Sequence, residues 1–374
     1  MIHNVLTNIM TDIYIIIAIV VSFLLEIYTL PHIIYIAKRK QLYDTPNQRK
    51  SHKNLTPRLG GVTFFPIILF VLALLITVFY QLNNNFYDAQ GATLPTHILG
   101  LTTAGVLIWF VGIQDDLVGV RYREKFVIQF MSAAIVVFGG CWINDFNGIF
   151  GIYGVPLYVS IPFTMLTIVF IMNSVNLIDG ADGLASGISV IAVIALGILH
   201  YFRGDMIPVV ICGSILGLLL PFFYYNVFLV KKKIFMGDTG SLTLGLYLGY
   251  LVVSYAMNSD DLEYLDRSSP TIMALSCLFI PIMDALRVVV VRLSKHQSPF
   301  YPDKQHIHHK LFDLGFSHKK VMIFLVFAAG FFIILNYFLI QFINNTIVLF
   351  VDLLIWLLII KGLNMLILKR KINK

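Results

Sequence analysis

The chain has 374 residues, of which 58% are apolar and only 13% are charged, and its mean hydropathy is +0.83. This composition excludes a soluble globular protein and predicts an integral membrane protein. The formal net charge of +7 comes from basic residues spread over several loops, where they would face anionic lipid, so we do not expect nucleic-acid binding.

Apolar windows long enough to cross a hydrocarbon core, which takes about 20 helical residues, recur along the whole chain. The windows are continuous and lack the alternation of a barrel strand, so each predicts a helix and the fold class is all-α. The first window lacks the basic start and cleavage site of a signal peptide, and we expect it to be retained. We expect a single transmembrane domain over residues 1–374 with about eleven spans, at roughly 11–30, 61–80, 97–113, 126–142, 157–173, 184–201, 206–225, 239–257, 270–292, 321–341 and 346–366.

The prolines and cysteines add two expectations about these windows. Pro270 and Pro281 lie in the same window, which predicts a bend that opens a lipid-facing groove. The three cysteines, Cys141, Cys212 and Cys277, fall in or beside windows, where we expect packing residues and no disulfide framework.

The basic residues predict the orientation of the chain in the membrane. If the amino terminus lies outside, all of the 27 Lys and Arg residues except Arg203 and Arg267 fall in cytoplasmic segments. Because cytoplasmic loops carry the excess of Lys and Arg, we expect an outside amino terminus and a cytoplasmic carboxyl terminus. The cytoplasmic loops that would carry function are then 44–60, 114–125, 173–184, 226–241 and 294–320.

Four polar clusters fall in these loops and are expected to meet at one membrane face. In chain order they are Gln114-Asp115-Asp116, the run from Asn173 to Gly183, the turn Gly237-Asp238-Thr239-Gly240-Ser241, and His306-Ile-His308-His309. Carboxylates beside membrane spans are costly, so their presence indicates a functional site.

Each cluster suits phosphate chemistry. The adjacent carboxylates of Asp115 and Asp116 repel each other, which invites Mg²⁺, a positively charged neighbour or a role as general base. The turn around Asp238 places a hard oxygen ligand at a helix start, where free N–H groups attract anions such as a magnesium diphosphate. The histidines lie between Lys304 and Lys310, which favours contact with phosphate oxygens; zinc is the rival ligand, although neither a cysteine nor a further acid stands at zinc spacing nearby.

Taken together, these motifs resemble those of the polyprenyl-phosphate N-acetylhexosamine-1-phosphate transferases. The resemblance runs in order from about residue 44 to residue 320 and includes Pro57-Arg58-Leu-Gly60-Gly61 and Ser298-Pro299-Phe300 in addition to the four clusters. It implies transfer of a sugar 1-phosphate from a UDP-N-acetylhexosamine to undecaprenyl phosphate, with release of UMP. It also implies a multi-pass enzyme of the bacterial cytoplasmic (inner) membrane. The implied cofactor is Mg²⁺, with Mn²⁺ as an alternative ion. A homodimer is one assembly that the resemblance leaves open.

The resemblance also implies roles for single residues. Asp238 would be the principal Mg²⁺ ligand, assisted by Asn176, while Asp182 would read the uracil base. Asp179 would support the nucleotide pocket, and Lys125 would pair with phosphate charge. Asp115 and Asp116 would deprotonate or orient the lipid phosphate. The diphosphate or the sugar would be bound by the three histidines, His306, His308 and His309.

Some positions depart from the family pattern or fit two readings. Asn226 stands twelve residues before Asp238, where relatives carry an Asn about ten residues before the metal ligand, so it is a weaker candidate for substrate binding. The run Lys231-Lys-Lys233 reads most simply as an inside-facing membrane anchor. Asp284 and Arg287 either face the cleft or pair with each other.

Three alternatives remain at this point. The donor could be UDP-MurNAc-pentapeptide, but the histidine spacing is closer to enzymes that start wall-polymer, O-antigen or capsule glycans, which favours UDP-N-acetylglucosamine. A secondary transporter or lipid flippase would carry its polar residues near the midplane in repeated halves, and this chain shows no internal repeat. A covalent Asp intermediate competes with direct attack by the lipid phosphate, which is the simpler mechanism.

Overall fold

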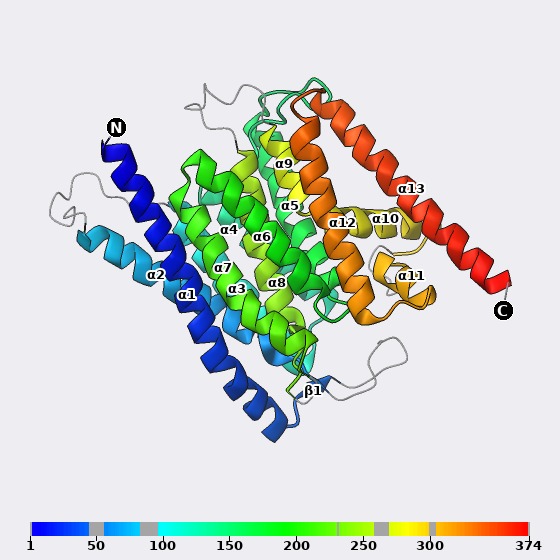
Figure 1. Ribbon diagram of the computed structural model, residues 1–374, viewed down its shortest axis with the longest axis horizontal. Helices are drawn as coiled ribbons and strands as arrows, with labels where there is room; N and C mark the ends of the chain where they lie inside the picture. Colours follow the sequence, from blue (N-terminus) through cyan, green and yellow to red (C-terminus); the bar gives the residue numbers. More distant parts are fainter. Residues whose placement is uncertain are drawn as a thin grey trace.

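The computed structural model describes residues 2–44, 56–82, 96–229, 232–257, 269–298 and 304–372, and within these ranges it confirms the all-α prediction (Figure 1). A two-stranded antiparallel ribbon, β1 (Tyr43–Asp44) with β2 (Thr56–Pro57), and the 3₁₀ helix η1 (Leu59–Thr63) accompany the helices. The α-helices are α1 (Ile2–Arg39), α2 (Phe64–Leu82), α3 (Thr96–Val118), α4 (Tyr122–Phe138), α5 (Leu157–Ile178), α6 (Leu184–Arg203), α7 (Met206–Val227), α8 (Gly237–Ala256), α9 (Pro270–Cys277), α10 (Phe279–Ser294), α11 (Ile307–Asp313), α12 (His318–Leu339) and α13 (Asn345–Ile372).

Each predicted window holds a helix, although several bounds differ and the short α11 lies in a predicted loop. Fewer of the helices qualify as spans by length and composition. Among the described residues eight helices qualify, or nine when α9 and α10 are counted as one bent span, against the predicted eleven or so. Of the two remaining predicted spans, α4 has only 17 residues and α8 is rich in glycine, serine, threonine and tyrosine. The orientation of the bundle in the membrane stays a prediction.

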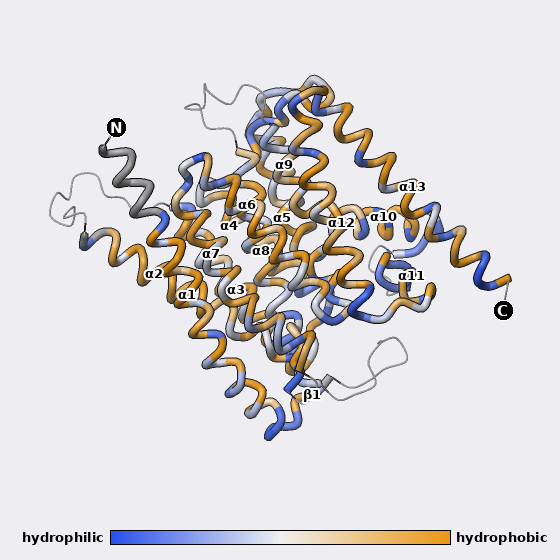
Figure 2. The backbone as a smooth tube through the Cα atoms, in the orientation of Figure 1, coloured by the Kyte–Doolittle hydropathy of each residue, from blue (hydrophilic) through white to orange (hydrophobic). Residues whose placement is uncertain are grey.

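The composition of α8 follows from its position at the centre of the bundle. All of its 20 residues except Asp238 and Ser254 are buried, and α3, α5, α6 and α9 pack around it. A helix that meets protein on every side has no need of large apolar residues on a lipid-facing surface, and small residues allow close helix packing. The surrounding helices are predominantly apolar along their length and carry their hydrophilic residues mainly toward the ends (Figure 2).

The window with two prolines forms two helices, bent by 79° at a break between Cys277 and Phe279. Pro270 occupies the start of α9 and Pro281 lies in the first turn of α10, where a missing N–H costs little. The bend therefore agrees with the sequence, while the lipid-facing groove stays a prediction. The three cysteines are buried and unbridged.

The segment around Gly60 and Gly61 is fastened to the start of α8 through its backbone. The N–H of Gly60 donates to Phe235 O at 2.9 Å, and the N–H of Gly61 donates to Met236 O at 2.8 Å. A Cβ at Gly61 would lie 2.0 Å from the Cα of Gly240, so only glycine permits this approach. The contact fixes the Pro57–Gly61 motif beside Asp238.

Candidate active site

The first turn of α8 places Asp238 between side chains from two other helices. Its Oδ1 accepts a hydrogen bond from Nδ2 of Asn176, at the end of α5, and its Oδ2 lies 3.3 Å from Nζ of Lys125, in the first turn of α4. Asn176 also donates to Oγ of Ser241 at 2.8 Å. The two predicted metal-site residues, Asp238 and Asn176, are therefore in direct contact.

Asp115 joins the same group of side chains through Lys125. Its Oδ2 lies 3.0 Å from Nζ of Lys125, and its Oδ1 accepts from the N–H of Val120 at 2.7 Å. The side chains of Lys125 and Asp115 are only 16% and 12% exposed, so water screens this ion pair less than a surface pair. One ammonium group thus bridges two carboxyl groups.

Asp116 has different surroundings from its neighbour Asp115. Its carboxylate accepts from the N–H groups of Asp238 and Thr239 at 2.8 and 3.0 Å, and from the hydroxyl of Thr239 at 2.6 Å. Asp116 therefore caps the start of α8, where a carboxylate is favoured by the unpaired amides and the helix dipole. The expectation that amides at this helix start are free for a diphosphate is wrong for these two.

The loop after α5 carries Asp182, which is held by two residues that we did not predict as site residues. Its Oδ2 lies 2.6 Å from Nζ of Lys233 and 3.5 Å from Nδ1 of His318, and its backbone N–H donates to His318 Nδ1 at 3.3 Å. Lys233 is therefore more than a membrane anchor. The nearby Asp179 is half-buried, and burial together with the charge of Asp238 raises its pKa well above the usual range.

Asn226 is buried and uses both ends of its amide on the backbone. Its Oδ1 accepts from the N–H of Gly183 at 2.6 Å, and its Nδ2 donates to Ile234 O at 2.7 Å. It ties the Asp182 loop to the segment that precedes α8. This geometry indicates that Asn226 positions the two loops, and the predicted contact with substrate stays a prediction.

Asp284 pairs with Arg287 and also anchors the histidine motif. Arg287 Nη2 donates to Asp284 Oδ1 at 2.8 Å and to Gln305 O at 2.5 Å. The ring of His306 donates to Asp284 Oδ2 at 2.9 Å, and the N–H of Ile307 donates to Oδ1 at 3.0 Å. The buried Asp284 therefore fixes the start of α11, and the ring of His306 is already engaged.

The two other histidines of the motif differ in exposure. His308 is buried against the loop after α5: a Cβ at Gly180 would lie 2.3 Å from its Nε2. Burial lowers the pKa of His308 to about 3, so its ring is neutral at physiological pH. The ring of His309 lies 4.2 Å from that of His308 and is only half-buried, so His309 is the most accessible of the three.

These contacts place the four predicted clusters in one region. Lys125 joins the first cluster to the third, Asn176 joins the second to the third, and His308 joins the fourth to the second. Within the described ranges, no three His, Cys, Asp or Glu side chains are arranged to hold a metal ion on their own. Residues 45–55, 230–231 and 299–303 of the predicted loops lie outside the described residues.

Lys233 and His318 were missed because their sequence context is uninformative. Lys233 is the last of three consecutive lysines, and His318 is a single histidine at a helix start, so neither position indicates a carboxylate partner. The one usable signal was that Lys233 stands five residues before Asp238 in a predicted functional loop.

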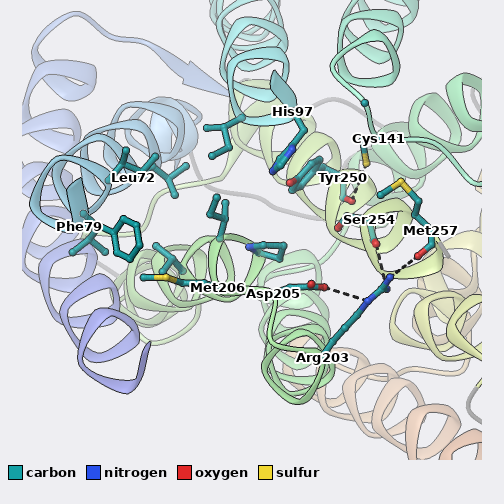
Figure 3. A pocket seen from close by; sticks show the side chains of 17 residues that line it. Leu72, Phe79, His97, Cys141, Arg203, Asp205, Met206, Tyr250, Ser254 and Met257 are labelled. Atoms are coloured by element: carbon teal, nitrogen blue, oxygen red, sulfur yellow. Dashed lines mark hydrogen bonds and ion pairs between the residues drawn. The ribbon is translucent and has the colours of Figure 1, made fainter. Parts of the chain in front are cut away.

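A cavity of about 430 Å³ lies at the opposite ends of these helices and contains none of the predicted site residues. Figure 3 shows His97 beside Tyr250, with Arg203 and Asp205 across the cavity. Arg203 donates to the carbonyl groups of Tyr255 and Met257, each at 2.6 Å, and its Nε lies 3.5 Å from Asp205. Arg203 therefore uses its guanidinium group on the backbone at the end of α8, and nothing in its contacts indicates a ligand site in this cavity.

The fold and the cluster define a class of protein: a polytopic α-helical membrane protein with carboxylates, a lysine and histidines gathered at one end of its helices, as suits an enzyme acting on charged substrates. Comparison with known proteins makes this specific. Residues 98–256 match the family model described as glycosyl transferase family 4. The chain is 30% identical over 302 residues to the undecaprenyl-phosphate alpha-N-acetylglucosaminyl 1-phosphate transferase of Escherichia coli (strain K12), covering 79% of this chain and 76% of that protein.

A second relative comes from another bacterium. The decaprenyl-phosphate N-acetylglucosaminephosphotransferase of Mycolicibacterium smegmatis (strain ATCC 700084 / mc(2)155) is 32% identical over 301 residues, covering 76% of this chain and 72% of that protein. The chain belongs to glycosyl transferase family 4, and within that family it is similar to polyprenyl-phosphate N-acetylglucosamine-1-phosphate transferases. The family resemblance predicted from the sequence is thus confirmed.

Proposed function

We propose that this protein transfers N-acetylglucosamine 1-phosphate from UDP-N-acetylglucosamine to undecaprenyl phosphate. An oxygen of the lipid phosphate attacks the phosphorus that carries the sugar, the bond from that phosphorus to the UMP oxygen breaks, and UMP leaves. The observation that carries the proposal is the Lys125 bridge between Asp115 and Asp238, which joins the predicted lipid-phosphate residues to the predicted metal ligand. The names of the relatives support both the sugar and the class of acceptor lipid.

The contacts suggest a different role for each residue of the site. Asp115 is held by Val120 and Lys125 and is placed to orient the lipid phosphate or to take its proton, while Lys125 balances phosphate charge. Asp116 fixes the start of α8 and so positions Asp238. His309 is the accessible histidine and the best placed of the three to contact the diphosphate or the sugar. Direct attack of this kind proceeds without a covalent intermediate on an aspartate.

The donor set fits Mg²⁺, with Mn²⁺ as the alternative ion. Asp238 would hold it through its carboxylate and Asn176 through its amide Oδ1, because oxygen is the hard ligand type that this ion prefers. The Nδ2 of Asn176 is the atom that contacts Asp238 and Ser241. Mg²⁺ commonly uses one or two carboxylates and completes its shell with water and substrate phosphates, so a full cage of protein ligands is not required. When bound, the ion would neutralise charge on the diphosphate of the donor.

We infer that this multi-pass membrane protein lies in the bacterial cytoplasmic membrane with its carboxylates facing the cytoplasm. The bacterial relatives and the bias of Lys and Arg toward the same set of loops support this inference. The product would be the lipid-linked sugar diphosphate that starts a cell-envelope glycan. A homodimer stays a prediction.

The test uses the purified full-length protein in detergent with undecaprenyl phosphate, Mg²⁺ and one UDP-sugar at a time. We expect UMP release and a lipid-linked product with UDP-N-acetylglucosamine, and loss of both when EDTA removes the metal. UDP-glucose should be a poor donor, because a site built to bond the acetamido group leaves polar partners unpaired without it. Rapid turnover of UDP-MurNAc-pentapeptide with none of UDP-N-acetylglucosamine would refute the assignment.

A further inference from the structure

We infer that Lys233 and His318 form a cradle that holds the Asp182 carboxylate on one side and leaves its other oxygen to accept an N–H from the pyrimidine base of the donor. The inference rests on the proposed function and deepens it, because it names positioning residues for recognition of the base. All contacts that the described residues make with this carboxylate fall on Oδ2. Oδ1 is thus the atom that remains for a ligand.

Lys233 supplies the charge of the cradle. Its Nζ lies 2.6 Å from Asp182 Oδ2, and the side chains of Lys233 and Asp182 are only 25% and 19% exposed, so the pair is partly shielded from water. The same ammonium group lies 5.4 Å from the centre of the Phe235 ring. A charge-assisted hydrogen bond of this kind restricts rotation of the carboxylate.

His318 fixes the other side of the cradle. Its Nδ1 lies 3.3 Å from the backbone nitrogen of Asp182, whose N–H donates to it, and 3.5 Å from Asp182 Oδ2. Its ring packs against Phe312 at 4.8 Å, and Phe312 belongs to the helix that bears His308 and His309. His318 therefore fixes the backbone of Asp182, and Lys233 fixes its side chain.

The backbone around the cradle is braced independently. Asn226 accepts from Gly183, the residue after Asp182, and donates to Ile234, the residue after Lys233. The two chain segments are thus held together without the salt bridge. Removing the Lys233 ammonium should release the carboxylate and leave the loops in place, so an effect on binding can be separated from an effect on folding.

The neighbouring Lys232 offers a matched control. It belongs to the same basic run and is exposed, whereas Lys233 is half-buried. If the run served only as a membrane anchor, loss of either charge would have the same effect. If Lys233 orients Asp182, only its loss should change how the nucleotide binds.

The experiment compares the full-length wild type with Lys233→Met, Lys233→Arg, Lys232→Met and His318→Phe. For each we would measure kcat, the KM of UDP-N-acetylglucosamine, the KM of undecaprenyl phosphate, and the inhibition constants of UMP and CMP. We expect Lys233→Met to raise the donor KM and the UMP inhibition constant by about tenfold, the loss typical of a charged hydrogen bond. The acceptor KM and kcat at saturating donor should stay within about threefold of the wild type.

Discrimination between the bases gives a readout that a merely structural role would not change. Uracil presents an N3–H to a carboxylate and cytosine does not, so the preference of the wild type for UMP over CMP should narrow in Lys233→Met and in His318→Phe. Lys233→Arg should restore most of the preference, and Lys232→Met should match the wild type. If Lys233→Met does not purify as a folded protein, Lys233→Gln is measured in its place.

Three results would overturn the inference: an unchanged UMP inhibition constant in Lys233→Met, a fall in kcat alone, or an equal effect of Lys232→Met. Failure of the proposed function is a separate result, because the wild type would then release no UMP from any UDP-sugar. Calorimetric titration of UMP into the wild type and Lys233→Met tests the cradle even in that case, and equal affinities would count against it.

Discussion

At the scale of single residues, the adjacent Asp115 and Asp116 present two similar side chains with different tasks. We expect Asp115→Asn to lower kcat by at least about tenfold, the lower range for acid–base and orienting groups, with little change in melting temperature. Asp116→Asn should lower both kcat and the melting temperature. The new amide nitrogen would face a backbone N–H at the start of α8, so part of the helix cap would be lost. The loss of such a cap costs about 1 kcal/mol of stability. UMP release and thermal melting in detergent check both, and identical behaviour of the two variants would remove the distinction.

Asp238 gives a second prediction at this scale. Asp238→Asn should abolish transfer while the protein still folds, since a neutral amide cannot replace a carboxylate beside a divalent cation and a diphosphate. The measurement is UMP release over a Mg²⁺ titration, with the melting temperature as the check on folding. Near-normal turnover at saturating Mg²⁺ would take Asp238 out of the site.

The sequence predicted which residues belong to the candidate site better than it predicted which residues they contact. The motifs around Asp115, Asn176, Asp238 and the histidines indicated phosphate chemistry because residue type and spacing carry that information. Which of two adjacent carboxylates caps a helix depends on the placement of α3 against α8, which no local pattern records. The same holds for Asp182 and Lys233, which are 51 residues apart.

At the scale of elements, the approach of η1 to α8 depends on a pair of glycines. Gly61→Ala would place a Cβ 2.0 Å from the Cα of Gly240 and 2.4 Å from its nitrogen, so the two segments must separate. We expect turnover to fall by at least about tenfold as Asp238 moves, since small displacements of reacting groups are costly. Gly362→Ala in α13 is the control, because the added Cβ would have no side chain or other segment of the described chain within 4 Å apart from its immediate chain neighbours. Equal activities would show that the site tolerates the separation.

The bend between α9 and α10 is covered by α12 and α13, and this contact gives a further prediction. Asn336 of α12 donates to Ser276 of α9 and to Asp352 of α13, each at 2.7 Å. Asn336→Leu should lower the free energy of unfolding by about 1–2 kcal/mol, the range for polar contacts between membrane helices. Tyr337→Leu, which changes the exposed neighbour, should not. Thermal melting of both variants is the test, and an unchanged melting temperature for Asn336→Leu would argue against the interhelical link.

Helix positions were predictable because continuous apolar runs must be helical in lipid, and the bend was predictable because proline lacks an N–H. The central location of α8 was not. A buried helix and a lipid-facing helix both read as apolar windows, and only the small and hydroxylated residues of α8 separate them in retrospect.

At the scale of the whole molecule, the charge bias predicts the topology. Reporters fused after residues 90, 150 and 262 should report the outside, and those after residues 45, 120, 232 and 300 the cytoplasm, because only Arg203 and Arg267 fall in outward loops. Paired alkaline phosphatase and fluorescent protein fusions provide the measurement. A cytoplasmic signal at residue 90 or 150 would reverse the orientation of the bundle and of its carboxylate face.

The burial of α8 has a consequence for how the protein responds to its surroundings. Asp238 stands on a helix that is enclosed by other helices along nearly its whole length, so variation in bilayer thickness or fluidity reaches it only through that enclosing layer. The outer helices can tilt to match a thicker or thinner membrane. The enclosed helix need not follow them, and the chemical centre is in this sense mechanically insulated from the lipid in which its own acceptor is dissolved.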